Sequence, residues 1–252
     1  MKKRKKSLAT DFDETLFFRN LPEGFKKEDV KKIKEFQEKG HLFGVCTGRP
    51  TIGVKDKTKG LFDFDFYIVT SGALILDRNF HVIEKHCLQY DFVEKLYNKY
   101  KNECLFFVQA NQLTYTFKRD ENLPIEQNII THIDEVKDYD IYGISLNLFS
   151  QEKALKVYQD IVDTYSHIQP FLNKECIDIV HKDCSKGKGI LTLKKYKNID
   201  LMCSIGDAHN DIPMLEDADL SFTFHRSDES VQQKATRVVD SIAEAIDVIE
   251  KE

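Results

Sequence analysis

The sequence predicts an α/β protein in which a Rossmann-like parallel-sheet core carries an inserted α+β cap domain. Short apolar runs alternate with helical patterns at both ends of the chain, whereas the middle is rich in strand-like segments. Alternating strands and helices are typical of a parallel sheet with right-handed crossovers. We therefore expect residues 1–84 and 181–252 to form the core, and residues 85–180 to form the cap.

The first part of the core begins with the apolar pair Leu8 and Ala9, which predicts a strand directly ahead of an acidic loop. Residues 28–38 carry apolar side chains about one helical turn apart, and Gly40 follows as a C-terminal cap, so a helix is expected there. Apolar runs predict two further strands, at residues 42–46 and 64–70.

The second part of the core repeats this alternation. Strands are predicted at residues 201–205 and 220–224, and helices at residues 187–196, 211–216 and 241–250. The last of these helices places four apolar side chains on one face, those of Ile242, Ala245, Ile246 and Ile249. We expect both parts to build a single sheet, with their acidic loops converging at its carboxyl edge.

The middle of the chain has a different pattern. Strands are expected at residues 104–109, 113–118, 141–149 and 176–180, with helices at residues 91–102 and 151–165. This segment contains no obvious catalytic string. Its Phe and Tyr side chains are expected mainly in a core, and spacing alone nominates none of them for substrate binding.

Composition excludes several classes of function. The formal net charge of −5 on 252 residues argues against nonspecific nucleic-acid binding. No apolar run reaches the length of a membrane span, so no membrane partner is expected. The six cysteines form no C-x-x-C pair, and the eight histidines lack metal-ligand spacing, so a reducing cytoplasm is expected and no zinc site. We expect a monomer or a small homo-oligomer.

Two acidic strings point to the chemistry. One runs from Asp11 to Thr15 as D-F-D-E-T, and the other runs from Gly206 to Asp211 as G-D-A-H-N-D. Ionised carboxylates repel one another, so a cluster of them is tolerated mainly around a cation. The alternative is a pair of solvated Asp-rich turns. Because both strings follow strand-like runs, a divalent cation that prefers oxygen ligands is the better explanation.

These strings resemble motifs of the haloacid dehalogenase (HAD) superfamily of phosphohydrolases, in its Cof-type branch with a C2 cap. Four motifs occur in the family's order: Asp11 to Thr15, Thr47-Gly48-Arg49, Ser185-Lys186-Gly187, and Gly206 to Asp211. The resemblance covers about 130 residues in two blocks, and the middle of the chain matches only in general pattern. It implies a Mg²⁺-dependent phosphatase acting on a small phosphorylated metabolite such as a sugar phosphate.

The resemblance also implies residue roles. Asp11 would be the nucleophile that forms an aspartyl phosphate, and Asp13 the acid and then the base. Mg²⁺ would bind Asp11, the Asp13 carbonyl and Asp207, with Asp211 orienting a metal-bound water. Thr47 and Lys186 would complete the catalytic groups by holding and neutralising the phosphoryl group. The remaining phosphate-binding positions would be the amides of Phe12 and Gly48, with Arg49 and Asn210.

Several alternatives remain open. Lys188 is a rival to Lys186, and Arg49 could either contact phosphate or form a salt bridge to the cap. Glu14 stands where the family usually has glycine, and Ser71 replaces an asparagine typical of the branch. These two departures leave room for a non-catalytic phosphometabolite sensor, or for a phosphotransferase, on the same fold.

Overall fold

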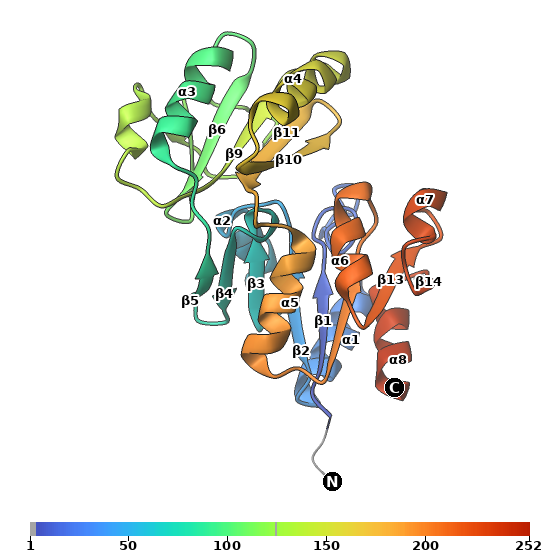
Figure 1. Ribbon diagram of the computed structural model, residues 1–252. Coiled ribbons are helices and arrows are strands. Elements are labelled where there is room, and N and C mark those ends of the chain that lie inside the picture. The colour runs from blue at the N-terminus through green and yellow to red at the C-terminus, as the bar shows by residue number, and fades with distance from the viewer. Residues whose placement is uncertain (1–3, 124) are drawn as a thin grey trace.

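The computed structural model describes residues 4–123 and 125–252, which form two lobes, each built around its own sheet (Figure 1). The strands of the larger sheet are β1 (Lys6–Thr10), β2 (Leu42–Cys46), β3 (Phe66–Val69), β4 (Leu74–Asp77), β5 (Val82–Lys85), β12 (Leu201–Ile205), β13 (Leu220–Phe224) and β14 (Arg237–Val239). Their order is β14-β13-β12-β1-β2-β3-β4-β5. The predicted α/β fold class is confirmed.

Strand β1 joins the two ends of the chain. It pairs in parallel with β12 on one side and with β2 on the other, so that Leu8 lies opposite both Cys203 and Phe43. Parallel pairing continues from β14 through to β3. The prediction that both parts of the core share one sheet is therefore confirmed, and the loops after β1, β2 and β12 lie at the same edge.

The prediction that the sheet is parallel is wrong at one edge of the sheet. Strands β4 and β5 pair antiparallel, β4 with β3 and β5 with β4. The chain reverses after β3 through a short 3₁₀ turn, η1 (Thr70–Gly72), in which all three residues have positive φ values of 49°, 51° and 91°. Such a tight reversal leaves no room for a crossover helix, so the next strand must return antiparallel.

Helices cover both faces of the larger sheet. They are α1 (Lys27–Glu38), α2 (Ile52–Thr58), α5 (Lys186–Lys197), α6 (Ile212–Asp217), α7 (Glu229–Gln232) and α8 (Ile242–Lys251). Because side chains alternate along a strand, Leu8 belongs to the same buried cluster as Phe36 and Ile246, whereas Ala9 belongs to the cluster of Ile190 and Met214. Helices α1 and α8 pack on the first of these faces, and α5 and α6 cover the other (Figure 1).

The smaller sheet contains β6 (Leu105–Ala110), β7 (Leu113–Thr116), β8 (Asn128–Ile129), β9 (Ile141–Asn147), β10 (Ile168–Asn173) and β11 (Cys176–His181). Their order is β10-β11-β9-β6-β7-β8, and all pairs are antiparallel except β7 with β8. Helices α3 (Tyr90–Tyr100) and α4 (Gln151–Thr164) accompany it, with the 3₁₀ turn η2 (Ile133–Val136). We propose that this lobe is the cap, at residues 85–180.

Predicted and observed elements agree best where the local sequence has a clear apolar pattern. The strands at residues 42–46, 201–205 and 220–224 match their predicted bounds. The strand predicted at 64–70 is shortened at both ends to β3, and it stops at Val69 because residues 70–72 turn. The elements that the sequence did not predict are α2, β4, β5, β8, β10, α7 and β14. Strand β10 contains Pro170, and β5 is largely exposed, so neither shows a clear strand pattern.

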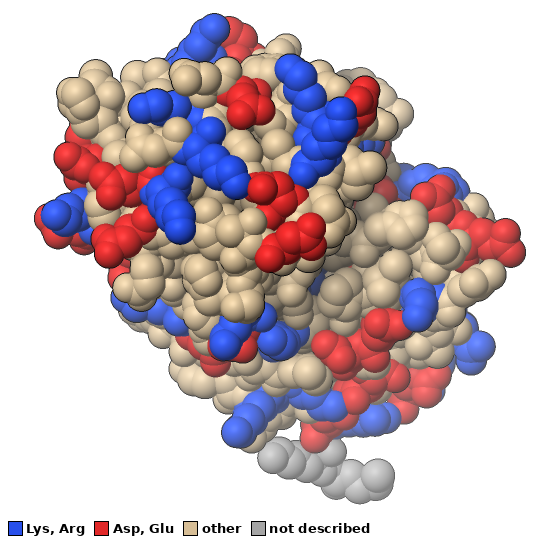
Figure 2. Space-filling view, turned by 45° about the horizontal axis from the view of Figure 1, so that its top comes forward, with Lys and Arg blue, Asp and Glu red and all other residues tan. Residues whose placement is uncertain are grey.

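Within the described residues, no helix combines the length and the apolar character that crossing a membrane requires. On the face shown in Figure 2, acidic and basic side chains are interspersed over both lobes.

Candidate active site

Three carboxylates from the two ends of the chain meet at the carboxyl edge of the larger sheet. Asp11 directly follows β1, and Asp207 lies two residues beyond the neighbouring strand β12, whose last residue is in register with Thr10. Asp211 lies in the 3₁₀ turn η3 (His209–Asp211). One carboxylate oxygen from each of these three residues lies within 4.8 Å of the other two. The adjacent parallel strands thus bring together residues that are nearly 200 positions apart.

Lys186 supplies a buried positive charge to this cluster. Its Nζ donates to Oδ1 of Asp11 and to Oδ1 of Asp211, each at 2.5 Å. Ser185 caps the N-terminus of α5 by accepting the backbone N–H of Lys188, which starts the helix with Lys186 facing the sheet. Lys188 itself is exposed, and its Nζ bonds the carbonyl of Lys182 instead. The geometry therefore favours Lys186 over its rival.

The protonation equilibria of this pair are shifted by their surroundings. Burial and the negative charge of Asp211 raise the pKa of Asp11 well above its usual value, although Lys186 acts in the opposite direction. Burial lowers the pKa of Lys186, but the attraction of Asp11 and Asp211 outweighs it, so that this pKa is raised. The ammonium group is therefore retained as the fixed cation of the site.

Asp211 is held by protein donors through both of its oxygens. In addition to Lys186 at Oδ1, its Oδ2 accepts the backbone N–H groups of Asp207 and Ala208, each at 3.0 Å. Gly206 makes this loop possible, because an added Cβ there would lie 2.6 Å from the Asp211 side chain. These contacts favour a positioning role for Asp211, consistent with the expectation that it orients a metal-bound water.

Asp207 is oriented by Thr15, whose hydroxyl donates to Oδ1 at 2.8 Å. Burial and the charge of Asp211 raise the pKa of Asp207. The donor set of Asp11 and Asp207 consists of carboxylate oxygens, which are the ligands that Mg²⁺ prefers, and a cation would offset the repulsion that raises both pKa values. The residues present therefore fit a magnesium ion.

Asp13 makes a two-point ion pair with Arg49. The Nε and Nη2 atoms of Arg49 donate to Oδ2 and Oδ1 of Asp13, both at 2.7 Å, while Nη1 donates to the carbonyl of Gly53. The guanidinium carbon also lies 5.0 Å from the centre of the Phe12 ring. Of the two alternatives for Arg49, the salt bridge to the cap is thus not observed, since the salt bridge is made to Asp13 within the core.

Thr47 and Gly48 follow β2 at the same edge. The Thr47 carbonyl accepts the backbone N–H of Ser71 at 3.0 Å, which ties the β2 loop to η1. Thr47 Oγ1 lies 3.2 Å from the Arg49 backbone nitrogen. Phe12 follows Asp11 and is fully buried, and Asn210 lies beside Asp211 in η3. Within residues 4–123 and 125–252, the Asn210 side chain makes no hydrogen bond.

The chain matches the haloacid dehalogenase-like hydrolase family over residues 8–250. It belongs to that family. The predicted membership of the HAD superfamily is thereby confirmed, and the chain is an enzyme of the HAD phosphatase type.

Individual relatives agree with this assignment. The 5-amino-6-(5-phospho-D-ribitylamino)uracil phosphatase YcsE of Bacillus subtilis is 23% identical over 247 residues, covering 96% of this chain and 94% of that protein. The crystal structure of a haloacid dehalogenase-like hydrolase from Bacteroides thetaiotaomicron has a TM-score of 0.85 at 17% identity, covering 98% of this chain and 100% of that one. A sugar phosphatase of HAD subclass IIB has a TM-score of 0.81 at 19% identity, with 98% of each chain covered.

The glutamate in the first motif of this HAD hydrolase takes an unusual conformation. Glu14 has a φ of 54°, in the left-handed region that glycine adopts without cost. This explains why glycine is usual at this position. The Glu14 side chain is exposed, its carbonyl accepts a hydrogen bond from Arg226, and the carboxylate does not join the Asp11 cluster.

Ser71 also adopts a left-handed conformation, with a φ of 51°. Its hydroxyl lies close to Gly48, where an added Cβ would be 3.4 Å from Ser71 Oγ. The hydroxyl therefore borders the expected phosphate site of this HAD hydrolase, where the branch usually presents an amide.

The smaller lobe adds polar side chains that the sequence analysis did not nominate. Asp178 on β11 accepts a hydrogen bond from Ser145 on β9, and Gln109 on β6 lies 3.3 Å from the same Ser145 hydroxyl. Asp178 also lies near Gly48, since an added Cβ there would be 3.6 Å from Asp178 Oδ2. Burial raises the pKa of Asp178, with Ser145 and Lys186 opposing the shift. The only sequence signal was polar residues inside otherwise apolar strands.

Proposed function

We propose that this HAD hydrolase is a Mg²⁺-dependent phosphatase that hydrolyses small phosphate monoesters, such as sugar phosphates, through an aspartyl-phosphate intermediate. The observation that carries the proposal is the placement of Asp11 beside Asp207 and the buried ammonium of Lys186. Phosphoryl transfer needs a nucleophile, charge neutralisation and a proton donor. Asp11 would be the nucleophile, Lys186 and a cation at Asp207 would neutralise charge, and Asp13, two residues beyond Asp11, would supply the proton.

In the proposed reaction, an Asp11 carboxylate oxygen attacks phosphorus, and the bond to the leaving oxygen breaks. For this step one Asp13 oxygen must leave Arg49 and be protonated; Asp13 then gives that proton to the departing alcohol. Asp13 then accepts a proton from water as that water attacks the aspartyl phosphate, which releases inorganic phosphate and restores Asp11. Magnesium, held by Asp11, Asp207 and the Asp13 carbonyl, would supply positive charge for the approach of two anions.

Phosphate would be held by the residues that surround Asp11. Lys186 offsets charge on the nucleophile and on the phosphoryl group, while the Thr47 hydroxyl and the amides of Phe12 and Gly48 act as fixed donors. Asn210 and Arg49 remain proposed phosphate contacts at the rim of the site. Arg49 is the weaker of these two because Asp13 occupies its guanidinium.

The proposed substrate class is supported by the polar residues of the smaller lobe. Gln109, Ser145 and Asp178 offer both donors and acceptors, which suit the hydroxyl groups of a sugar or polyol. A relative that acts on a phosphorylated ribitylamino compound and a structural neighbour described as a sugar phosphatase agree with such a ligand. We propose a cytoplasmic location, which suits the six cysteines, all of them free thiols.

The test is phosphate release from a panel of phosphate esters with and without Mg²⁺. The expected result is Mg²⁺-dependent turnover that Asp11→Asn abolishes, while Asp63→Asn, an exposed carboxylate outside the site, retains full activity. Ester binding without any release would instead favour a sensor. Transfer of phosphate to an added alcohol in preference to water would favour a phosphotransferase. Unchanged activity of Asp11→Asn would overturn the proposal.

A further inference from the structure

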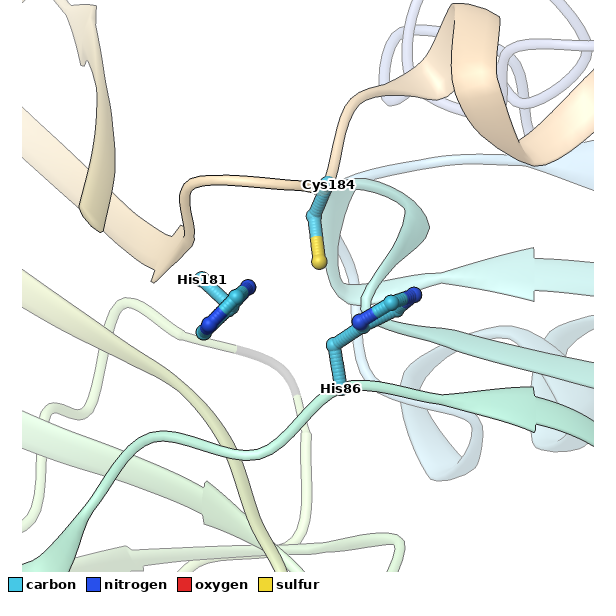
Figure 3. A group of neighbouring side chains, drawn as sticks. All are labelled: His86, His181 and Cys184. Atoms are coloured by element: carbon cyan, nitrogen blue, oxygen red, sulfur yellow. The ribbon is translucent and has the colours of Figure 1, made fainter. Parts of the chain in front are cut away.

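Two histidines and a cysteine converge where the chain passes between the two lobes. His86 follows β5 on the way into the smaller lobe, while His181 ends β11 and Cys184 follows it on the way back. One ligand atom from each of the three side chains lies within 4.8 Å of the other two. Figure 3 shows the sulfur of Cys184 pointing between the two imidazole rings. The histidines lack metal-ligand spacing in the sequence, and only the folded chain assembles this group.

Each imidazole already has a carboxylate partner on one ring nitrogen. Nε2 of His86 lies 2.9 Å from Oε1 of Glu84, and Nδ1 of His181 lies 3.5 Å from Oδ2 of Asp183. The Glu84 contact leaves Nδ1 of His86 as the nitrogen that could bind an ion. Histidines that bind metals usually donate their second N–H to a carboxylate or carbonyl in this manner. Nδ1 of His181 accepts the Asp183 backbone N–H at 3.3 Å, so binding of an ion through Nε2 would require this hydrogen bond to break and the ring to change tautomer.

The surroundings allow an ion to enter and the ligands to adjust. Cys184 is buried, but the side chains of His86 and His181 are 30% and 31% exposed. Zinc bonds of about 2.0–2.3 Å require ligand atoms roughly 3.5 Å apart, so the partly exposed rings would have to turn toward Cys184 to complete the set. The two rings are stacked, with centroids 5.7 Å apart and an interplanar angle of 17°. Because an imidazole binds a metal in its own plane, at least one ring must turn before both nitrogens face one ion.

We propose that His86, His181 and Cys184 form a binding site for a transition-metal ion of the Zn²⁺ class, with water in the fourth position. Thiolate and imidazole ligands select borderline ions such as Zn²⁺, whereas the carboxylates around Asp11 select Mg²⁺. The two sites therefore differ in their metal chemistry. On binding, the ion would take the place of the Cys184 thiol proton, which is released to solvent.

Such an ion would join the two connections between the lobes. One ligand belongs to the outgoing segment and two belong to the returning segment, and Cys184 lies two residues before Lys186. Metal binding would therefore restrain movement of the smaller lobe relative to the larger one. This inference does not depend on the proposed phosphatase substrate.

The experiment is a titration of the full-length, untagged, chelator-treated protein with Co²⁺ followed by Zn²⁺. We expect one equivalent of Co²⁺ to give a thiolate-to-cobalt charge-transfer band with tetrahedral ligand-field bands, and Zn²⁺ but not Mg²⁺ to displace it. Cys184→Ser should abolish the charge-transfer band, and His86→Gln and His181→Gln should each weaken binding at least about tenfold. Cys104→Ser, Cys87→Ser and His225→Gln are matched controls that should keep it.

Hydrogen exchange provides a second measurement on the same proteins. Zn²⁺ should slow exchange in residues 86–89 and 181–185 of the wild type and of the control variants, but not of His86→Gln. If Cys184→Ser does not fold, the two histidine variants carry the test. Absence of the charge-transfer band in the wild type, or equal binding by the wild type and His86→Gln, would show an adventitious ion only and overturn the proposal.

Discussion

Arg49 donates hydrogen bonds to both carboxylate oxygens of Asp13, each at 2.7 Å. Asp13 lies two residues after Asp11, the proposed nucleophile. A fork of this kind fixes the orientation of a carboxylate as well as its charge. The guanidinium is itself held by the Gly53 carbonyl and the face of the Phe12 ring. Arg49 therefore orients the ionised Asp13 carboxylate, and one oxygen must be released from this pair before Asp13 can carry the proton of the proposed acid.

Replacement of Arg49 by methionine should lower kcat by about 10- to 100-fold, because the proton relay loses its orientation. KM should change less than about threefold, and Arg49→Lys should recover only part of kcat, since lysine offers a point charge in place of a fork. Steady-state kinetics on one phosphate ester measures both constants. A large rise in KM with kcat unchanged would instead assign Arg49 to phosphate binding.

Lys186→Met should abolish turnover and destabilise the protein. Asp11 and Asp211 would lose the ammonium group that contacts both of them, and removing one partner of a buried ion pair costs about 3–5 kcal/mol. Mg²⁺ should then raise the unfolding midpoint of the variant more than that of the wild type, because the ion replaces the missing charge. Thermal unfolding with and without Mg²⁺ measures this difference.

The control for that experiment is Lys188→Met, at the exposed lysine two residues further along α5. It should leave stability within about 0.5 kcal/mol and activity unchanged. Equal losses in the two variants would show that helix composition, and not the charge at the site, is responsible.

Gly72→Ala should lower the free energy of unfolding by about 3 kcal/mol, through left-handed strain and overpacking together. The φ of Gly72 is 91°, and an added Cβ would lie 2.3 Å from the backbone oxygen of Ser185, which caps α5. Because the Ser185 backbone must move away from the added Cβ, the neighbouring Lys186 should also be displaced, which should reduce activity.

Gly40→Ala separates the two causes. Gly40 has a similar φ of 84° but nothing within 4 Å of an added Cβ, so only the conformational cost of about 1 kcal/mol applies. Denaturant unfolding of both variants gives the comparison. If Gly72→Ala and Gly40→Ala lower the free energy of unfolding equally, the close approach to Ser185 does not contribute to the destabilisation.

Asp178→Asn should raise KM for sugar phosphates by about tenfold, the effect of losing one charged hydrogen bond to substrate. For p-nitrophenyl phosphate, which lacks sugar hydroxyls, both constants should stay within about twofold of wild type. Asp163→Asn, on the exposed side of α4, serves as the matched control. A parallel loss on both substrates would place Asp178 in support of Lys186 and not in substrate selection.

The sequence by itself determined the strongest elements and the acidic strings. Strands β2, β12 and β13 are short apolar runs bounded by polar residues, and local pattern is sufficient to locate them. The acidic residues of the first and last motifs could be placed at one edge of the sheet, because parallel strands present their carboxyl ends together. The family motifs then indicated which carboxylates would act.

The tertiary structure alone decided the relationships that depend on three-dimensional approach. The antiparallel edge arises from positive φ values at residues 70–72, which no apolar pattern encodes. The pairing of Arg49 with Asp13, and the meeting of His86 with His181 and Cys184, join residues that are distant in sequence and carry no common spacing. Local sequence specifies the conformation of a segment, whereas such contacts depend on how separate segments pack, and that is settled only when the whole chain folds.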